Sequence, residues 1–554
     1  MKSANLLKRS IYMALVATII MGVLTARLFL IQVIHGPRYS KMALPQQTLS
    51  IPIEEIKGNI TDRNGIPLTG IDTEYELIVI PKSMEHETEA YDAVYRLTQR
   101  EKESLPVTSH YILQVVNKDP MLLYDIESGK YRGLIIKKNN IRYGKSSLAR
   151  HLVGYIRKSD NKPLSGIEKA YGDFLHPGEY KVLHALAYNK DAVLPNYRYV
   201  ISEPESDYQD VRLTLDFHIQ DALENILDIY TDHKHGGIVV EVGSGEILAL
   251  ASRPHFDQNN PTKGDDSQIS ELSIPLNPYP PGSIFKLVVA AAALESGKYN
   301  EYSMFHCKGG IQVGSHFVRC HESTEGLGHI TFKEAFAYSC NDTFIKIASD
   351  LGGDVIVDMA EQLGFGTPLD IDLQNASGQF GSKDTYIGSG ISNLAIGQGD
   401  VLVTPLQVAD ALLTIINDGE KKRLSLVKGL VSPNGEFESN DKPIISSKRI
   451  LSSNTARILK RCMVDTVEYG TGTIARDLEI GGTAGKTGTP EVSSDANDST
   501  MYGWFAGYFP VEEPRYIVVI MSKEEGVASK TAAPVFHDIA RAIWQLEKEF
   551  GEKK

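Results

Sequence analysis

Two pairs of strand-like runs stand at opposite ends of the second half of the chain. The first pair, GGIVVEV and GEILALASRP, flanks a tight Gly-Ser turn at 243–244. The second pair, YGWFAGYFPV and RYIVVIMSK, flanks EEP at 512–514. Because an isolated two-stranded hairpin is only marginally stable in water, each pair needs further strand partners. The sequence therefore predicts one antiparallel sheet assembled from distant parts of the chain.

Helical spacing surrounds these strands. One apolar helix face is formed by Ile219, Leu223, Ile226 and Leu227. A second apolar stripe recurs in steps of three and four at Phe536, Ile539, Ile543, Leu546 and Phe550. Strands at both ends with helices between them predict an α+β module, in which helices cover a sheet. The alternative, two separate small domains, leaves each hairpin without enough partners.

The beginning of the chain differs in composition from the rest. A predominantly apolar run from about Ser10 to Ile34 follows several basic residues, and as a helix it is long enough to span roughly 30 Å of hydrocarbon. Arg27 must then lie near an interface. The sequence VLTAR has leucine where signal-peptide cleavage needs a small residue, which disfavours a cleaved signal. We expect a cytoplasmic tail at 1–9, an uncleaved anchor at 10–34, and the rest of the chain outside the cell membrane.

Length and charge constrain the part of the chain beyond the anchor. A chain of 554 residues suits two or three domains, and 42% hydrophobic residues are typical of a globular protein. The formal net charge of -13 argues against a nucleic-acid partner, which needs a basic patch. Residues 36–210 mix strand-like runs, such as YELIVIP and GLIIKKN, with charged loops. They contain no obvious catalytic cluster, so we expect a pedestal or interaction region there.

The four cysteines are too few for a disulfide scaffold in a chain of this length. Cys307 and Cys320 each adjoin a histidine, in FHCKGG and VRCHES. A zinc site is disfavoured, because ligands adjacent in sequence tend to point apart and the usual C-x2-C spacing is missing. A disulfide closing this short loop and two free thiols both stay open as alternatives. Cys462 is interpreted as a small core residue.

The segment PPGSIFKLVVAAAALE places Ser283 and Lys286 at the start of an otherwise apolar helix. Ser283 comes directly after Pro281 and Gly282, so it lies near a helix N-terminus, where backbone N–H groups favour developing negative charge. Lys286 shares its helix face, and the next apolar turns desolvate the amine, which lowers its pKa and suits a general base. Taken alone, a helix cap and a snorkelling lysine are the simpler interpretation.

A second segment, AFAYSCNDTFIKIA, places Ser339, Cys340 and Asn341 inside an amphipathic helical pattern. Polar groups are normally excluded from the buried side of such a pattern. By itself the segment indicates no more than a bend or a cap.

A third segment, GGTAGKTGTPEV, contains Lys486, Thr487, Gly488 and Thr489 directly before the C-terminal strand pair. Glycine here lets a ligand approach the strand edge, and Lys486 supplies a positive charge. This tripeptide motif is also weak alone.

Together and in this order, S-x-x-K, S-x-N and K-T-G are the signature set of penicillin-binding proteins and class A β-lactamases. The chain resembles a class B penicillin-binding protein, the monofunctional peptidoglycan D,D-transpeptidase type. The resemblance covers nearly the whole chain, including GNITDRNGIPLT, SGIEKAYGDFL, AIGQGDVLVTPLQVA and VEYGTGTIA. The middle of S-x-N is Cys340 rather than aspartate, which weakens a β-lactamase interpretation more than this one.

The resemblance implies the penicillin-recognising serine acyltransferase fold, an α+β fold with an antiparallel five-stranded sheet covered by helices. It further implies an elongated pedestal of the dimerisation type at 35–210 and a transpeptidase domain at 211–554. No cofactor and no metal are expected, and His321 and His329 are interpreted as loop or packing residues.

The resemblance also assigns chemical roles. Ser283 attacks the penultimate D-Ala carbonyl of a stem peptide, releases the terminal D-Ala and holds an acyl-enzyme, which an amino group of a neighbouring stem then takes over. Lys286 takes the serine proton, Ser339 relays protons to the leaving group, and Asn341 orients Lys286 and the substrate amide.

The remaining motif holds the substrate. Lys486, Thr487 and Thr489 bind its terminal carboxylate, and Gly488 gives room. The backbone N–H groups of Ser283 and Thr489 form the oxyanion hole, worth about 3 kcal/mol per donor.

The partners implied are peptidoglycan stem peptides, β-lactam antibiotics, the bacterial cytoplasmic membrane and a polytopic membrane glycan polymerase. A β-lactamase or D,D-carboxypeptidase shares the chemistry but needs neither the anchor nor the pedestal. A β-lactam sensor would carry several membrane helices and an H-E-x-x-H protease. A non-catalytic scaffold is disfavoured by the intact motifs, and a glycosyltransferase fusion by the lack of a further catalytic domain.

Overall fold

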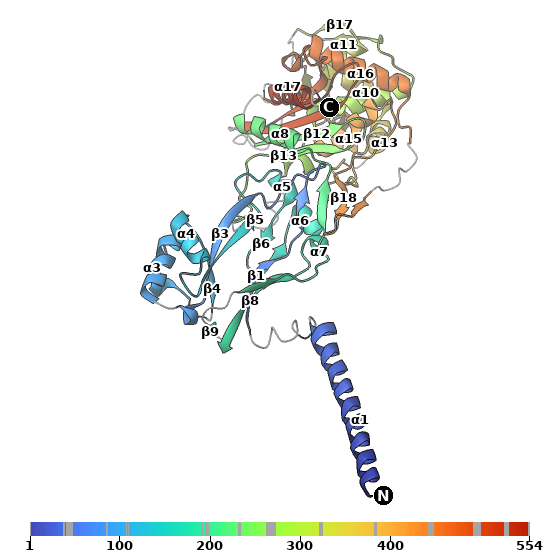
Figure 1. Cartoon of the computed structure of the whole chain (residues 1–554). Coiled ribbons are helices and arrows are strands. Elements are labelled where there is room, and N and C mark those ends of the chain that lie inside the picture. Colours follow the sequence, from blue (N-terminus) through green and yellow to red (C-terminus); the bar gives the residue numbers. More distant parts are fainter. Residues whose placement is uncertain are drawn as a thin grey trace. The chain divides into compact units, whose positions relative to one another are not determined.

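The computed structural model of the chain contains two compact units, each discontinuous in sequence (Figure 1). The first comprises 1–56, 73–141 and 177–206, and the second comprises 57–72, 142–176 and 207–554. The second unit thus takes in two segments from the range expected to form the pedestal, and the sequence division into domains stays a prediction. The structure describes residues 2–36, 39, 48–84, 87–106, 108, 110–189, 192–193, 199–230, 234–261, 273–320, 325–381, 385–440, 448–490, 500–525 and 531–551.

The chain begins with helix α1 (Lys2–Phe29), which continues into the π-helical turn η1 (Leu30–Ile34). The stretch Ile11–Ile34 is long and apolar enough to cross a membrane, and none of it is buried inside the protein. An apolar surface of this size needs a non-aqueous surrounding. One N-terminal helix of this kind suggests a single-pass membrane anchor.

Beyond α1, the described part of the first unit holds two small sheets and the α-helices α3 and α4. Strand β8 is flanked by β1 and β10 in one antiparallel sheet, and β3 lies between β4 and β5 in the other. The runs YELIVIP and GLIIKKN fall on β3 and β5, so their prediction as strands is confirmed. The elements are β1 (Thr48–Glu55), β3 (Asp72–Val79), α3 (Glu87–Thr98), β4 (Tyr111–Gln114), α4 (Pro120–Glu127), β5 (Leu134–Ile141), β8 (Tyr180–Asn189), β9 (Ala192–Val193) and β10 (Val200–Ser202).

A five-stranded antiparallel sheet forms the centre of the second unit. Its order is β13-β12-β22-β21-β20, and every neighbouring pair is antiparallel. The two predicted hairpins are β12–β13 and β21–β22, and the pairing of β12 with β22 joins them across the sequence. The expected sheet is therefore confirmed. The bounds are β12 (Lys234–Glu241), β13 (Ile247–Ser252), β20 (Ala484–Gly488), β21 (Thr500–Phe509) and β22 (Tyr516–Glu525).

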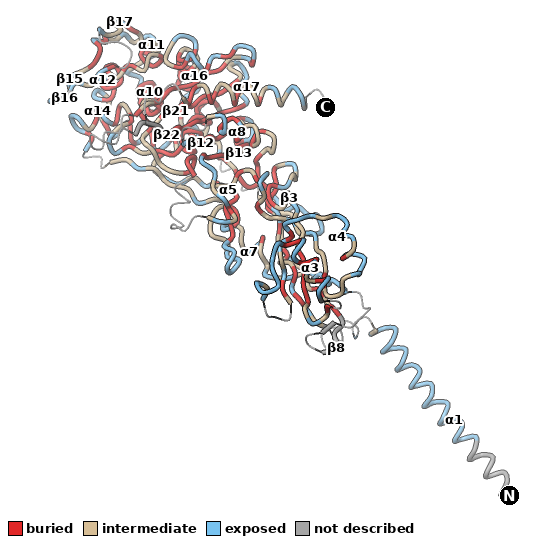
Figure 2. Tube along the Cα trace, turned by 90° about the vertical axis from the view of Figure 1, so that its left-hand side faces the viewer, coloured by how far each residue is buried: buried red, intermediate tan, exposed pale blue. Residues whose placement is uncertain are grey.

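This sheet is buried on both faces. Along β22, Ile517, Val519 and Met521 join the core that contains α10 (Lys286–Glu295) and α15 (Pro405–Ile416), whereas Val518 and Ile520 join the core against α8 and α17. Successive side chains of a strand point to opposite faces, so one strand serves both cores. The sheet is consequently the middle of three layers. Figure 2 shows the trace around β12, β21 and β22 as largely buried.

The two helices on one face match the predicted stripes. Helix α8 (Phe217–Ile229) buries all four residues of its predicted apolar face. Helix α17 (Ala532–Gly551) buries Phe536, Ile539 and Ile543, and Leu546 is partly buried against the same core. The burial of Phe550 lies outside the described residues.

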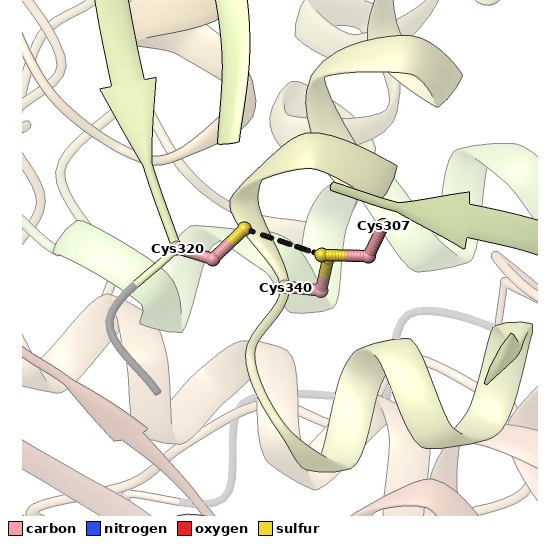
Figure 3. Close-up of side chains that lie close together, drawn as sticks. All are labelled: Cys307, Cys320 and Cys340. Carbon is pink, nitrogen blue, oxygen red and sulfur yellow. Dashed lines mark hydrogen bonds between the residues drawn. The ribbon is translucent and has the colours of Figure 1, made fainter. Parts of the chain in front are cut away.

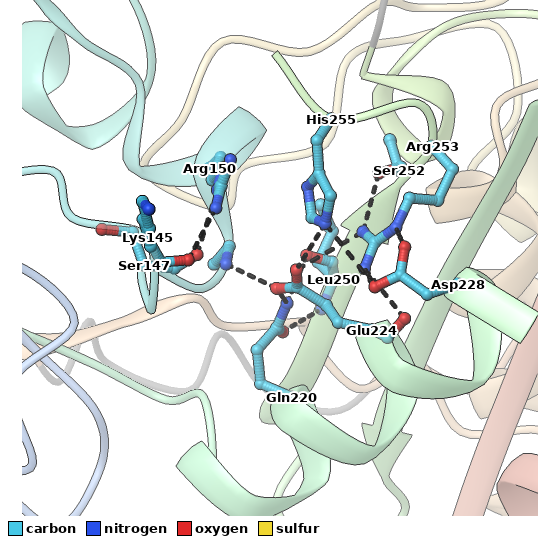
Figure 4. Close-up of polar contacts among 11 residues, drawn as sticks. Lys145, Ser147, Arg150, Gln220, Glu224, Asp228, Leu250, Ser252, Arg253 and His255 are labelled. Carbon is cyan, nitrogen blue, oxygen red and sulfur yellow. Dashed lines mark hydrogen bonds and ion pairs between the residues drawn. The ribbon is translucent and has the colours of Figure 1, made fainter. Parts of the chain in front are cut away.

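A buried polar network ties α8 to the sheet and to the segment around Ala149 (Figure 4). The Glu224 carboxylate accepts from the N–H of Ala149 at 2.6 Å and from the Gln220 amide at 2.8 Å. Gln220 also accepts from the N–H of Leu250, and Arg253 pairs with Asp228 through two nitrogen atoms. These partners compensate the cost of burying the Glu224 carboxylate. The network also links the 142–176 segment to α8 and the sheet within the second unit.

The remaining described elements of the second unit are short strands and helices. Helices α5, α6 and α7 lie in the 142–176 segment, and β2 pairs with β11 in a four-stranded sheet. The bounds are β2 (Ile60–Thr61), α5 (Arg150–Val153), β6 (Ile156–Arg157), β7 (Lys162–Pro163), α6 (Gly166–Ala170), α7 (Gly172–Leu175), β11 (Asp210–Leu213), β14 (Met304–Cys307), β15 (Gly310–Val313), β16 (His316–Arg319), β17 (Gly328–Thr331), α11 (Phe332–Ala337), α12 (Asn341–Leu351), α13 (Gly353–Leu363), α14 (Ser389–Ala395), β18 (Val427–Val431), β19 (Phe437–Ser439) and α16 (Ser453–Glu468).

The contact between α17 and the sheet can be tested by truncating Phe536, whose ring lies 4.6 Å from that of Phe505. Phe536→Ala should lower the free energy of unfolding by about 3 to 5 kcal/mol, because it leaves a cavity in a fully buried core. Both tryptophans, Trp504 and Trp544, lie in the second unit, so tryptophan fluorescence during denaturant unfolding reports this loss. The control Gln545→Ala, at an exposed position of α17, should change the value by less than about 0.5 kcal/mol. Equal effects of the two substitutions would contradict the packing.

Candidate active site

Ser283 lies in η5 (Gly282–Phe285), a short 3-10 helix that leads directly into α10. Gly282 has a φ of 53°, and a Cβ there would lie 2.7 Å from the backbone nitrogen of Pro490. Its N–H donates to the carbonyl of Gly397 at 2.9 Å. Glycine is required both by the left-handed backbone and by this close approach. The turn is thereby fixed against the segment directly after K-T-G.

Lys286, one helical turn beyond Ser283, is completely buried. Its Nζ donates to the carbonyl of Ser339 at 2.6 Å, to Ser339 Oγ at 3.2 Å and to Asn341 Oδ1 at 2.6 Å. The interpretation as a snorkelling lysine is therefore wrong. Burial lowers the pKa of Lys286 to about 8, while the neighbouring Cys340 and Cys320 act in the opposite direction.

Ser339 marks a break between α11 and α12. Its φ of 55° is left-handed, which is uncommon for a residue with a Cβ. Cys340 is the N-cap of α12, and Asn341 is the first helical residue. The Asn341 amide donates to the carbonyl of Arg319 at 2.8 Å. The break thus turns the backbone and hydroxyl oxygens of Ser339, together with Asn341 Oδ1, toward Lys286.

Lys486, on the edge strand β20, is also completely buried. Its Nζ donates to Ser339 Oγ at 3.1 Å and to the carbonyl of Thr487 at 3.1 Å. A hydroxyl oxygen has two lone pairs, so Ser339 can accept from both lysines. Ser339 Oγ thereby links the amines of Lys286 and Lys486.

The end of β20 packs against the turn that carries Ser283. A Cβ on Gly488 would lie 2.8 Å from both the carbonyl of Pro281 and the side chain of Ile284. The backbone of Thr489 lies beside Gly282 in the same way. Only a residue without a side chain allows the strand to approach this closely.

Thr471 belongs to the same site, although no sequence pattern assigned it a role. Its Oγ1 lies 2.6 Å from Oγ1 of Thr487. Thr471 lies within VEYGTGTIA, and the resemblance of that segment to the family is the sequence signal that points to it. The contact orients the hydroxyl of Thr487 at the strand edge.

The structure brings all the predicted site residues into one neighbourhood of the second unit. Lys286, Ser339, Asn341 and Lys486 are joined by hydrogen bonds, and Thr487, Gly488 and Thr489 line the strand end beside the turn of Ser283. Their catalytic and binding roles stay predictions.

The cysteines and histidines outside the motifs can also be placed. Cys307 and Cys320 are free thiols with their Sγ atoms 3.7 Å apart, so this structure holds the free-thiol alternative. Cys462 is buried in the main core, as predicted. His329 packs against His306 with ring centroids 4.6 Å apart, whereas His321 lies outside the described residues.

Comparisons with known proteins agree with this geometry. Residues 236–541 match the family model described as the penicillin binding protein transpeptidase domain. The chain is 27% identical to stage V sporulation protein D of Bacillus subtilis, over 96% of this chain and 85% of the relative. It is 25% identical to the peptidoglycan D,D-transpeptidase MrdA of Escherichia coli K12, over 76% of this chain and 73% of that one.

A solved structure is similar along almost the whole chain. It was determined in a study of the structural coordination of polymerization and crosslinking by a peptidoglycan synthase complex, and it is 26% identical with a TM-score of 0.69. The match covers 97% of this chain and 98% of that one. The protein belongs to the penicillin-binding protein transpeptidase family, and its fold is that of the class B members.

The close approach of β20 to the Ser283 turn can be tested at Gly488. Gly488→Ala should destabilise the second unit by about 1 to 3 kcal/mol, because the added methyl group overlaps the backbone of Pro281. Tryptophan fluorescence during denaturant unfolding measures the change. Gly243→Ala is the control, since a Cβ there meets nothing within 4 Å. A Gly488→Ala protein as stable as the control would show that the strand end and the turn are not in contact.

Proposed function

We propose that the protein is a serine D,D-transpeptidase that cross-links peptidoglycan stem peptides through an acyl-enzyme on Ser283. The observation that carries the proposal is that Lys286 and Lys486 both donate to Ser339 Oγ. The Ser339 hydroxyl thus links Lys286, which lies one turn from the nucleophile, to Lys486, which belongs to the proposed carboxylate-binding strand. Acylation by β-lactams results from the same chemistry and inhibits the enzyme.

Lys286 is the general base for Ser283. With a pKa of about 8, about a tenth of the amine is neutral at pH 7, compared with less than a thousandth for an exposed lysine. The bonds to the carbonyl of Ser339 and to Asn341 Oδ1 hold the amine in one orientation. In the neutral amine the lone pair is then available for the serine proton.

Ser339 passes the proton on to the leaving amine. A hydroxyl that accepts from two amines keeps its own hydrogen for donation, so it can exchange protons between Lys286 and the leaving group. Asn341 acts as a positioning residue for Lys286 and for the substrate amide.

The substrate carboxylate binds along β20. The ammonium of Lys486 supplies positive charge beside the strand edge, and the hydroxyls of Thr487 and Thr489 supply directional donors. The N–H groups of Ser283 and Thr489 stabilise the tetrahedral oxyanion. An edge strand is suited to this because, in the described part of the chain, one side of the β20 backbone is not paired with another strand.

The group that takes the acyl chain from Ser283 is an amino group of a second stem peptide rather than water. The likeness to proteins named peptidoglycan D,D-transpeptidase supports this choice over a D,D-carboxypeptidase. Incubation with a stem-peptide donor and acceptor distinguishes the two, because a carboxypeptidase releases D-Ala without forming cross-linked dimers.

The anchor places the enzyme at the bacterial cytoplasmic membrane as a single-pass protein. The basic N-terminal tail stays in the cytoplasm, and the pedestal at 35–210 and the transpeptidase domain at 211–554 lie outside. A polytopic membrane glycan polymerase is the proposed partner, contacted through the anchor and the pedestal. The likeness to a solved structure from a peptidoglycan synthase complex supports it.

The nucleophile is tested by mass spectrometry of the full chain in detergent after incubation with a fluorescent penicillin. We expect one covalent adduct, mapped to Ser283 and absent from Ser283→Ala. Ser296→Ala, at the exposed C-cap of α10, which follows the Ser283 turn, is the matched control and should retain the adduct. An adduct that survives Ser283→Ala would refute the assignment.

The base is tested by the pH dependence of the acylation rate. Because only neutral Lys286 accepts a proton, the rate should rise with pH and level off above a midpoint near 8. Lys286→Ala should acylate very slowly and lack this rise, and a single cooperative unfolding transition, even at lower stability, would show that the fold persists. A wild-type rate that does not change between pH 6 and pH 9, measured by stopped-flow fluorescence, is incompatible with this role.

A further inference from the structure

Three cysteine thiols meet beside the S-x-N segment (Figure 3). Cys320 Sγ lies 3.7 Å from Cys307 Sγ and 3.7 Å from Cys340 Sγ, and all three sulfur atoms lie within 4.8 Å of one another. All three side chains are buried. We call these residues the thiol cluster. The proposed catalytic mechanism uses none of them.

Each thiol comes from a different element of the second unit. Cys307 is the last residue of β14, Cys320 comes directly after β16, and Cys340 caps α12. Cys340 Sγ accepts from the N–H of Thr343 at 3.5 Å and from its hydroxyl at 3.3 Å. Cys320 Sγ accepts from the N–H of Asp342 at 3.4 Å. The cluster therefore sits directly against the segment that holds Lys286.

We propose that Cys320 is a site of reversible thiol–disulfide modification, bridging either Cys340 or Cys307 but never both, and that only the Cys320–Cys340 bridge slows acylation. The formation of either disulfide does not depend on the proposed function. The predicted effect of the Cys320–Cys340 disulfide on acylation rests on the proposed function.

A disulfide suits the cluster better than a metal ion. Three thiolates around Zn²⁺ would leave a net negative charge beside the carboxylate of Asp342, which is 1% exposed. A disulfide is neutral. The proposed extracytoplasmic location also favours disulfides over free thiols.

Cys320 is the thiol that reacts first. It is the most exposed of the three, at 7%. A hydrogen bond from the Cys340 thiol, with a smaller contribution from the N–H of Asp342, lowers the pKa of Cys320. The same hydrogen bond, together with burial, raises the pKa of Cys340. A lower thiol pKa increases the thiolate fraction that attacks disulfides.

The oxidant is an external disulfide, either of a small thiol or of a dithiol protein. The Cys320 thiolate attacks one of its sulfur atoms, a mixed disulfide forms, and one external thiol leaves. The thiolate of Cys340 or Cys307 then attacks Cys320 Sγ, and the second external thiol leaves. Two electrons and two protons pass from the cysteine pair to the external disulfide, and an external dithiol reverses both steps.

The two bridges affect the site differently. Closing Cys320–Cys340 shortens the Sγ–Sγ distance from 3.7 Å to about 2.05 Å and withdraws Cys340 Sγ from Thr343. Cys340 lies between the two residues that hold Nζ of Lys286, and a displacement of about 1 Å in such a site costs about a hundredfold in rate. Closing Cys307–Cys320 leaves Cys340 in its cap position. Cys307 therefore protects the site by competing for Cys320.

The test uses the full chain in detergent, reduced, desalted and then exposed to oxidised glutathione. Remaining thiols are alkylated, the bridge is mapped by peptide mass spectrometry, and acylation by a fluorescent penicillin is timed before oxidation, after it and after dithiothreitol. In the unsubstituted chain we expect one bridge that consumes two thiols of the cluster. Cys462→Ser, outside the cluster, is the matched control and should behave as the unsubstituted chain does.

The single variants separate the two bridges. Cys307→Ser should form Cys320–Cys340, lose about a hundredfold in acylation rate and recover it with dithiothreitol. Cys340→Ser, which keeps a good N-cap, should form Cys307–Cys320 with a rate equal to that of its own reduced form. Cys320→Ser should form no bridge and should not respond to the oxidant.

Three results would overturn the proposal. These are stable glutathione adducts without an internal bridge, a fully bridged Cys307→Ser protein that acylates at its reduced rate, and stoichiometric zinc in the protein as isolated. A reduced chain that does not acylate at all would instead refute the proposed function, and the mapped bridges would still decide whether Cys320 is the shared partner.

Discussion

The buried amine of Lys286 is the constraint that organises the second unit. An amine without solvent exposure needs polar partners inside the protein, and the carbonyl of Ser339 and Asn341 Oδ1 supply them at 2.6 Å. Both come from the break between α11 and α12, so the left-handed backbone of Ser339 is a consequence of turning two acceptors toward one amine. The same burial lowers the pKa of Lys286 to about 8. The environment that holds the lysine therefore also makes it a base near neutral pH.

The five-stranded sheet supplies the rigid frame on which this arrangement depends. It is buried on both faces, which holds its edge strand β20 firmly, while among the described residues one side of that strand has no strand partner. Lys486 reaches from β20 to Ser339 Oγ, and Gly488 lets the strand approach the Ser283 turn. Three elements far apart in the sequence are thereby fixed around one hydroxyl.

The sequence was sufficient for the parts with local periodicity. Strand-like runs on either side of a short turn predicted the hairpins, and three-four spacing predicted the faces of α8 and α17. It could not predict that 57–72 and 142–176 join the second unit, since a strand as short as β2 has no readable period. Motif spacing identified residues such as Ser283 and Lys486, but no local pattern encodes a hydroxyl shared by two lysines or the contact of Cys320 with Cys340.

The central claim is that one serine, one buried lysine and one strand edge form a single acyl-transfer site. A crystal structure of the protein acylated by a β-lactam tests it most directly. The account predicts a covalent bond to Ser283 Oγ, the acyl oxygen between the N–H groups of Ser283 and Thr489, and the drug carboxylate on the hydroxyls of Thr487 and Thr489. An acyl group on another residue, or a carboxylate bound away from β20, would contradict it.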